Sequence, residues 1–143
     1  MFDEVTGEGI CVIDLDTVMP GTVLYDFGDL VRTTISPTPE DEQELSKVCV
    51  RMPIFKALVQ GYLGTTQSFL TDIEKDNLVL SCQLITLESA IRFLTDYLSG
   101  DPYFKIRHPG QNLHRCRAQL KLFKELHQKE ELMRHVLQQI DEN

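Results

Sequence analysis

The stretch TDIEKDNLVLSCQLITLESAIRFLTDYL, residues 71–98, decides the fold class of this protein. It opens on Thr71 and has a glutamate three positions later, at Glu74, a spacing that predicts a capping box at a helix start. Apolar residues then occupy nearly every side of the helix, which is typical of a helix buried in a core. Gly100-Asp101-Pro102 breaks the pattern. The sequence therefore predicts one long buried helix from about residue 71 to about Leu98.

The segments on either side also have helical periodicity. Apolar residues at helical spacing predict a helix over residues 25–35 and a last helix over about 111–140. Pro53 is expected in the first turn of another helix that runs to about Leu63, with Gly64 as its stop signal. The chain is thus predicted to be mainly helical.

One segment favours a β-strand. Ile10-Cys11-Val12-Ile13 is a short β-branched run after the turn signal Gly7-Glu8-Gly9, and it is typical of a buried strand. The expected fold is mainly α with a small N-terminal β element. It forms a single domain over residues 1–143, in which a strand and loop at 1–29 precede a helical part at 30–143.

Composition excludes several classes of partner. The chain has 22 acidic and 14 basic residues and a net charge of −8, which repels phosphate backbones and anionic lipid, so neither nucleic acid nor a membrane is expected as partner. No apolar run approaches the roughly 20 residues that span a bilayer. The start, Met1-Phe2-Asp3-Glu4, is acidic, and we expect neither a signal peptide nor any location other than the cytoplasm.

The four cysteines do not form a metal-ligand pattern. Cys11, Cys49, Cys82 and Cys116 are far apart and include no CxxC pair, whereas structural zinc sites usually have close ligand pairs. We expect four reduced thiols, most of them buried.

Carboxylates are concentrated near the N-terminus, at Asp14, Asp16, Asp26 and Asp29. A carboxylate just past a buried strand is a rigid oxygen ligand, and magnesium usually takes one or two such ligands from protein. Asp14 or Asp16 could equally cap a turn, as aspartates often do. The density of carboxylates favours the metal site modestly over the turn.

Two stretches of the sequence resemble a known enzyme superfamily. Ile13-Asp14-Leu15-Asp16, followed by Tyr25-Asp26-Phe27-Gly28-Asp29, is similar to the phosphotransferases that include aminoglycoside kinases and choline kinases. The longer string, residues 12–21 with 25–32, resembles bacterial N-acetylhexosamine 1-kinases above all. The later stretches 91–98 and 100–105 are similar to the same group. The resemblance covers most of the chain and implies the helical C-terminal lobe of a protein-kinase-like fold.

The resemblance also implies roles for individual residues. Asp14 matches the magnesium-binding aspartate, with Asp16 as an auxiliary ligand, and Asp26 matches an aspartate that braces the catalytic loop without doing chemistry. Thr17 is assigned to the substrate side together with Arg92 and Tyr103. Magnesium and ATP are the cofactors that the resemblance implies for the complete enzyme.

The sequence departs from this family in one respect. In kinases the catalytic aspartate and a metal-binding asparagine lie about a dozen or more residues before the metal aspartate. Counting back from Asp14 reaches Met1, and neither a His-x-Asp-xxxx-Asn string nor a nucleotide-binding lysine segment is present. No residue of this chain is assigned as catalytic, and we expect a piece of a kinase that is inactive alone.

Arg92 has two interpretations. A guanidinium in the middle of the most apolar helix is costly unless it is paired, and Glu88 lies one turn earlier at a favourable i, i+4 spacing. Alternatively, Arg92 points into a cleft with Tyr103 and holds sugar hydroxyls or an acetamido carbonyl, as the resemblance implies.

The leading functional hypothesis is the C-terminal part of an ATP-dependent kinase that phosphorylates the anomeric hydroxyl of an N-acetylhexosamine. A kinase for another small alcohol, or a non-catalytic helical remnant or protein-binding module, remains the alternative. The expected partner is a small sugar, and a homodimer through the edge of the Ile10–Ile13 strand is a further possibility.

Overall fold

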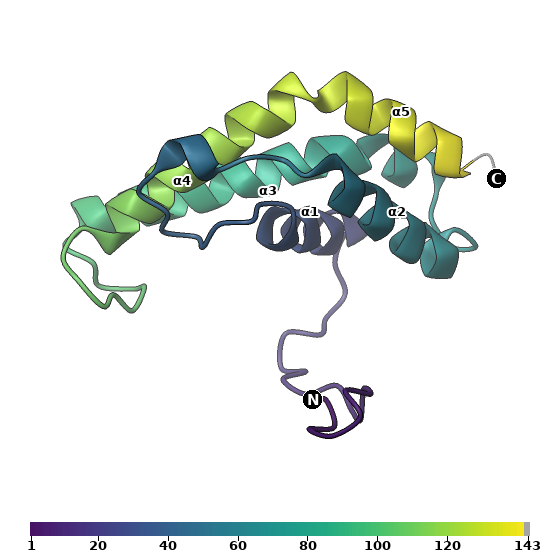
Figure 1. Cartoon of the computed structure of the whole chain (residues 1–143), viewed down its shortest axis with the longest axis horizontal. Coiled ribbons are helices and arrows are strands. Elements are labelled where there is room, and N and C mark those ends of the chain that lie inside the picture. The colour runs from purple at the N-terminus through teal and green to yellow at the C-terminus, as the bar shows by residue number, and fades with distance from the viewer. Residues whose placement is uncertain (142–143) are drawn as a thin grey trace.

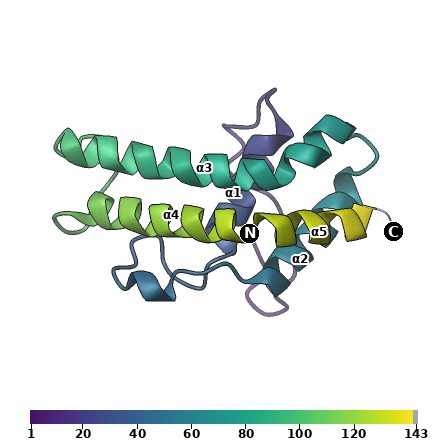
Figure 2. The same cartoon turned by 90° about the horizontal axis from the view of Figure 1, so that it is seen from above.

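The computed structural model describes residues 1–141 and is mainly helical. Its elements are α1 (Val23–Thr34), a short 3-10 turn η1 (Leu45–Lys47), α2 (Met52–Thr66), α3 (Asp72–Leu98), α4 (Gln111–Gln128) and α5 (Glu130–Asp141). The long helix α3 lies beside α4, which runs in the opposite direction, and α1 packs on α3 (Figures 1 and 2). α2 and α5 close the other end of the body (Figure 1). The prediction of a mainly α fold is confirmed.

The start of α3 confirms the predicted capping box. The Thr71 hydroxyl accepts a hydrogen bond from the Glu74 backbone N–H at 3.3 Å, and the Glu74 carboxylate accepts one from the Thr71 N–H at 2.8 Å. These two bonds satisfy backbone donors that a helix start leaves without partners. The bonds from Thr71 also hold the pKa of Glu74 below its usual value.

The main hydrophobic core lies between helices α1 to α5, each of which contributes buried side chains to it. Its fully buried side chains are large and apolar, among them Phe27, Phe55, Ile35, Leu63, Leu78, Leu122 and Met133. The close approach of α1 to α3 depends on Gly28, whose missing Cβ would lie 2.7 Å from the Ser81 carbonyl oxygen and from Ile85. The Tyr25-Asp26-Phe27-Gly28 stretch thus serves helix packing as well as any role in a site.

The predicted N-terminal strand is not formed. The only β feature within residues 1–141 is an isolated antiparallel bridge between Phe2 and Gly9. Ile10 and Cys11 form hydrogen bonds with Met1 beside that bridge, but Ile10–Ile13 is not a strand. Val12 is 79% exposed, so the run is not buried either. A strand needs a neighbouring strand along its length to satisfy its backbone groups. Within residues 1–141 the neighbouring segment is Met1–Phe2, which reaches only as far as Cys11.

Three further expectations need correction. Gly64 does not end α2, which continues to Thr66, because one glycine lowers helix propensity by only about 1 kcal/mol. The single last helix is two helices, α4 and α5, separated at Lys129, whose ψ of 8° departs from helical geometry. α3 is not buried on every side, because Leu84, Ile91 and Leu98 are exposed.

α3 is also the one helix in residues 1–141 that could span a membrane by length and composition, with a mean hydropathy of 1.4 over its most apolar window. A core helix passes the same test, and α3 packs along its length against α1 and α4. This finding is weak evidence for a membrane span.

The cysteines differ more in exposure than expected. Cys82 and Cys116 are buried, Cys49 is half-buried and Cys11 is exposed. Burial raises the pKa of Cys82 to about 12, and burial is also the main reason that the pKa of Cys116 is raised.

These differences predict the order of thiol labelling with Ellman's reagent at pH 8. Cys11 should react first, while Cys82, with a thiolate fraction of about 10⁻⁴ at that pH, should react only after unfolding, because the thiolate is the nucleophile. Cys116 should behave like Cys82. Chymotryptic peptide mapping of the labelled protein identifies the sites, and four equivalents in guanidinium chloride are the control. Fast labelling of Cys82 in the native protein would contradict this burial.

Candidate functional site: a cleft between α1, α3 and α4

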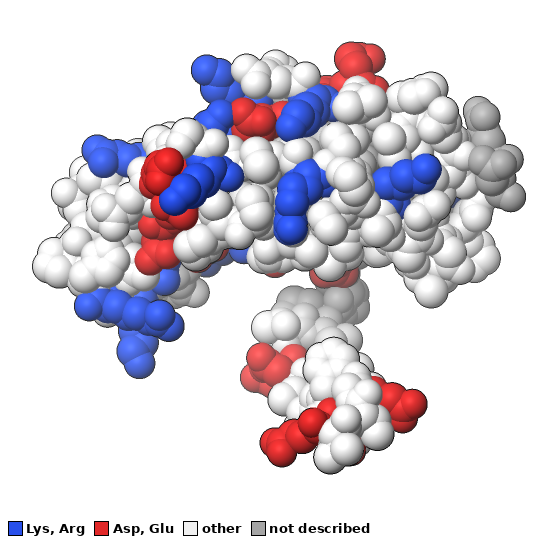
Figure 3. Space-filling model, in the orientation of Figure 1, with Lys and Arg blue, Asp and Glu red and all other residues white. Residues whose placement is uncertain are grey.

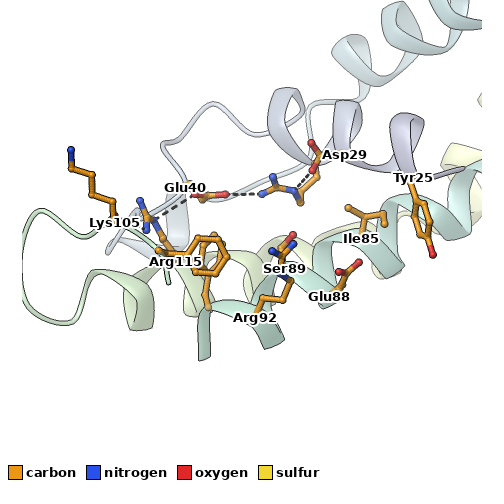
Figure 4. A pocket seen from close by; sticks show the side chains of 12 residues that line it. Tyr25, Asp29, Glu40, Ile85, Glu88, Ser89, Arg92, Lys105 and Arg115 are labelled. Atoms are coloured by element: carbon orange, nitrogen blue, oxygen red, sulfur yellow. Dashed lines mark hydrogen bonds and ion pairs between the residues drawn. The ribbon is translucent and has the colours of Figure 1, made fainter. Parts of the chain in front are cut away.

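An open cleft of about 870 Å³ lies on the helical body. α1, α3, α4 and the loops at residues 36–44 and 99–110 form its walls (Figure 4). Its lining is mixed: aromatic and aliphatic groups alternate with charged ones, and the residues are Tyr25, Asp29, Arg32, Glu40, Ile85, Glu88, Ser89, Arg92, Phe93, Phe104, Lys105 and Arg115. A volume of this size is in the range of small-molecule sites.

One wall of the cleft is a chain of alternating charges. Asp29 accepts a hydrogen bond from Arg32 at 2.8 Å, Arg32 donates to Glu40 at 2.7 Å, and Arg115 Nε lies 3.5 Å from the other Glu40 oxygen (Figure 4). Burial alone lowers the pKa of Arg32, but the bonds from Glu40 and Asp29 outweigh it and raise that pKa overall. These ion pairs hold α1, the 36–44 loop and α4 together, so both guanidiniums already have partners.

Arg92 lies on the opposite wall and is held differently. Its guanidinium carbon is 5.9 Å from the centre of the Tyr103 ring and 5.4 Å from that of Phe104. Cation–π contacts of this kind hold the plane of the group but leave its N–H donors free. Within residues 1–141 the structure gives Arg92 no ion pair, with Glu88 or any other carboxylate. The structure therefore brings Arg92 and Tyr103 together, but of the two only Arg92 lines the cleft, with Glu88 as a separate acceptor. Tyr103 lines an adjoining hollow with Arg92 and Phe104.

The loop at 99–110 is positioned by a residue that the sequence analysis missed. Asp96, only 5% exposed, accepts hydrogen bonds from the Tyr103 and Phe104 N–H groups at 2.9 Å and from the Asn112 amide at 2.8 Å. Asn112 also donates to Asp101 at 2.9 Å, and Gly100 and Asp101 have positive φ. A signal existed in the sequence: an aspartate in the last turn of a helix is unfavourable with the helix dipole, which suggests a specific partner.

The other predicted site residues lie outside the cleft. Asp14, Asp16 and Thr17 are exposed and belong to the N-terminal segment (residues 1–22), which leaves the helical body (Figure 1). Asp14 has a left-handed φ of 63°, and residues 15–18 form a turn. Asp26 lies in the first turn of α1 and is exposed. Its charge is a secondary cause, after burial, of the raised pKa of Tyr62.

The N-terminal segment is rich in carboxylates, the type of group that binds cations, but these carboxylates do not enclose a binding site. It contains five acidic residues and no basic one, and Figure 3 shows only acidic charge on it. In residues 1–141 no group of three or more His, Cys, Asp or Glu side chains gathers as a metal cage. Two carboxylates such as Asp14 and Asp16 nevertheless suit magnesium, which keeps several waters and takes one or two protein carboxylates.

No model of a known protein family matches this sequence.

Proposed function

We propose that this chain is the substrate-binding helical part of an ATP-dependent small-molecule kinase, acting on the anomeric hydroxyl of an N-acetylhexosamine. The observation that carries the proposal is the cleft, in which the free donors of Arg92 lie beside the acceptor Glu88 and the aromatic rings of Phe93 and Phe104. Tyr103 stacks on Arg92 from an adjoining hollow. A sugar has hydroxyls for the polar groups and an apolar ring face for the aromatic ones. The motif resemblance at residues 12–32 and 91–105 supports the same class.

Asp14 and Asp16 would hold magnesium in the complete enzyme, where the ion neutralises the phosphate charge that develops during transfer. The segment that carries them runs directly into α1, and Tyr25 in the first turn of α1 lines the cleft. The proposed metal ligands are therefore close in sequence to a residue that lines the proposed substrate cleft. ATP would bind to parts of the enzyme that this chain does not contain.

The isolated chain is expected to bind an N-acetylhexosamine without phosphorylating it. Saturation-transfer difference NMR with N-acetylglucosamine measures binding, and a coupled assay with ATP and magnesium measures turnover. Arg92→Ala should weaken binding by about ten- to a hundredfold, because hydrogen bonds to a charged donor contribute about 1.5–3 kcal/mol. Arg117→Ala, an exposed arginine of α4 outside the cleft, is the matched control and should leave binding unchanged.

Two results would contradict the assignment. Equal loss in the Arg92 and Arg117 variants would show that binding is not at the cleft, and absence of binding to any hexosamine would remove the sugar as substrate. Turnover by the isolated chain that disappears in Asp14→Ala would contradict its expected inactivity. Thermal unfolding of both variants separates a lost contact from a folding defect.

A non-catalytic, protein-binding module is the second candidate, and one observation favours it. α3 presents a continuous row of exposed aliphatic residues on the side away from its packed face, more than a small-molecule site needs.

A further inference from the structure

The exposed row on α3 has the spacing of a coiled-coil seam. It consists of Leu80, Leu84, Leu87, Ile91, Leu94 and Leu98, separated by alternating steps of four and three residues. These are the a and d positions of a heptad repeat sustained over 18 residues, about 27 Å of helix. We call this row the α3 stripe.

The α3 stripe is not used by the fold that carries it. Leu84, Ile91 and Leu98 are 53%, 56% and 75% exposed, and the other three members are partly exposed. The packed face of α3 is a different one, on which Cys82, Thr86 and Ala90 are buried. A contiguous aliphatic row on the surface of a folded domain marks an interaction site.

The stripe is its own complement when two copies run antiparallel. Leu80 then lies opposite Leu98 of the second copy, Leu84 opposite Leu94, and Leu87 opposite Ile91. Every a position therefore faces a d position throughout the stripe, and the two-fold axis passes near residue 89. A pairing that a single patch makes with itself is the mark of a symmetric dimer.

The two ends of the stripe also have complementary shapes. At the Leu80 end, an apolar hollow of about 270 Å³ opens between Leu24, Tyr25 and Leu84. At the other end Leu98 projects from the last turn of α3. Antiparallel pairing places the projecting Leu98 of each copy at the hollow of the other, and apolar cavities smaller than this hollow accommodate a benzene ring.

Charge at the edge of the stripe fits the same arrangement. Glu88 and Arg92 lie on one edge of α3 and are both exposed. In the antiparallel register Arg92 of the second copy lies opposite residue 86 of the first. It is therefore two positions from Glu88, or about 3 Å along the helix axis. Each glutamate near the two-fold axis therefore has an arginine of the other copy beside it, which offsets the repulsion between the two glutamates.

We propose that the α3 stripe is the interface of a symmetric, antiparallel homodimer. α3 is already held in a helix by α1 and α4, so pairing does not require folding of the helix, which is the main obstacle to association of short isolated coiled-coil segments. The proposal stands without the kinase assignment, although Tyr25, Glu88 and Arg92 belong both to the cleft and to this interface.

Sedimentation equilibrium of the whole chain tests the interface. The expected mass is twice the 16.4 kDa of one chain. Leu84→Glu/Ile91→Glu should reduce the mass to that of one chain, with at least a hundredfold weaker association and unchanged circular dichroism. Leu132→Glu, on an α5 residue that is 50% exposed, and Ile10→Glu/Val12→Glu are the matched controls and should remain dimeric.

Cross-linking tests the register in a background with Cys11 and Cys49 replaced by serine. Leu84→Cys and Leu94→Cys should form a disulfide when the two variants are mixed, and neither should cross-link efficiently to itself. Self-linking of Leu84→Cys would indicate parallel pairing and overturn the antiparallel arrangement. A strict monomer at 1 mM, or a dimer lost only in Ile10→Glu/Val12→Glu, would overturn the interface. So would a monomer that binds phosphatidylcholine vesicles through the stripe.

Discussion

Replacing Gly28 with alanine is expected to destabilise this protein by about 2–3 kcal/mol, and valine by more, because each adds atoms to a filled contact. The new Cβ would lie 2.7 Å from the Ser81 carbonyl oxygen and 2.7 Å from Ile85 Cγ1. The Ser81 carbonyl belongs to the backbone of α3 and cannot move unless α1 and α3 separate. Phe27 and Val31, fully buried on either side of Gly28, would lose packing at the same time.

Gly61→Ala is the matched control for this prediction. Gly61 is also helical, in α2, but a Cβ there would meet no atom within 4 Å. The same chemical change should stabilise the protein by about 0.5–1 kcal/mol, because alanine loses less conformational freedom in a helix. Urea unfolding followed by circular dichroism measures both variants. Equal stability of the Gly28 and Gly61 variants would refute the close packing of α1 on α3.

Replacing Asp96 with alanine is expected to cost about 3–5 kcal/mol, since the change leaves several buried donors without an acceptor. The donors are the Tyr103 and Phe104 N–H groups and the Asn112 amide. The loop at 99–110 should loosen, and with it the Tyr103 and Phe104 rings that hold Arg92 in the cleft. Sugar binding should therefore fall together with stability.

Hydrogen exchange at single amides distinguishes this mechanism from general destabilisation. The Tyr103 and Phe104 amides should lose protection in Asp96→Ala before amides in the core of α2 do. Asp76→Ala, an exposed aspartate on the same helix, should change stability by no more than about 0.5 kcal/mol. If the two loop amides keep their protection in Asp96→Ala, Asp96 does not position the loop.

Local sequence signals predicted the structure correctly where it depends on residues that are close in the sequence. The capping box at Thr71 and Glu74 predicted the start of α3, and Gly100-Asp101-Pro102 predicted its end, because caps and breakers act within one turn of helix. Segments with a period of 3.6 residues became helices for the same reason. Two predicted boundaries were wrong: α2 continues past Gly64, and the last helix breaks at Lys129, where the backbone leaves helical geometry.

The cleft could be predicted only in part. Arg92 and Tyr103 were predicted from motif resemblance to line one cleft near Asp14. The structure stacks Arg92 on the Tyr103 ring, but neither Tyr103 nor Asp14 lines the cleft. The charged wall of Asp29, Arg32, Glu40 and Arg115 was not predicted, since its members come from three separate parts of the chain. Asp96 was missed because its three donors lie beyond the helix break.

The sequence by itself determined the helical class of this protein, the position of its central helix and the acidic character of the N-terminal segment, because composition and short-range periodicity encode these properties. Tertiary structure alone decided whether Ile10–Ile13 pairs as a strand and which face of α3 is covered. Both questions depend on what lies opposite a residue in space. The segment beside Ile10–Ile13 is the short Met1–Phe2, which pairs only as far as Cys11. α1 and α4 cover one side of α3 and leave the row from Leu80 to Leu98 exposed.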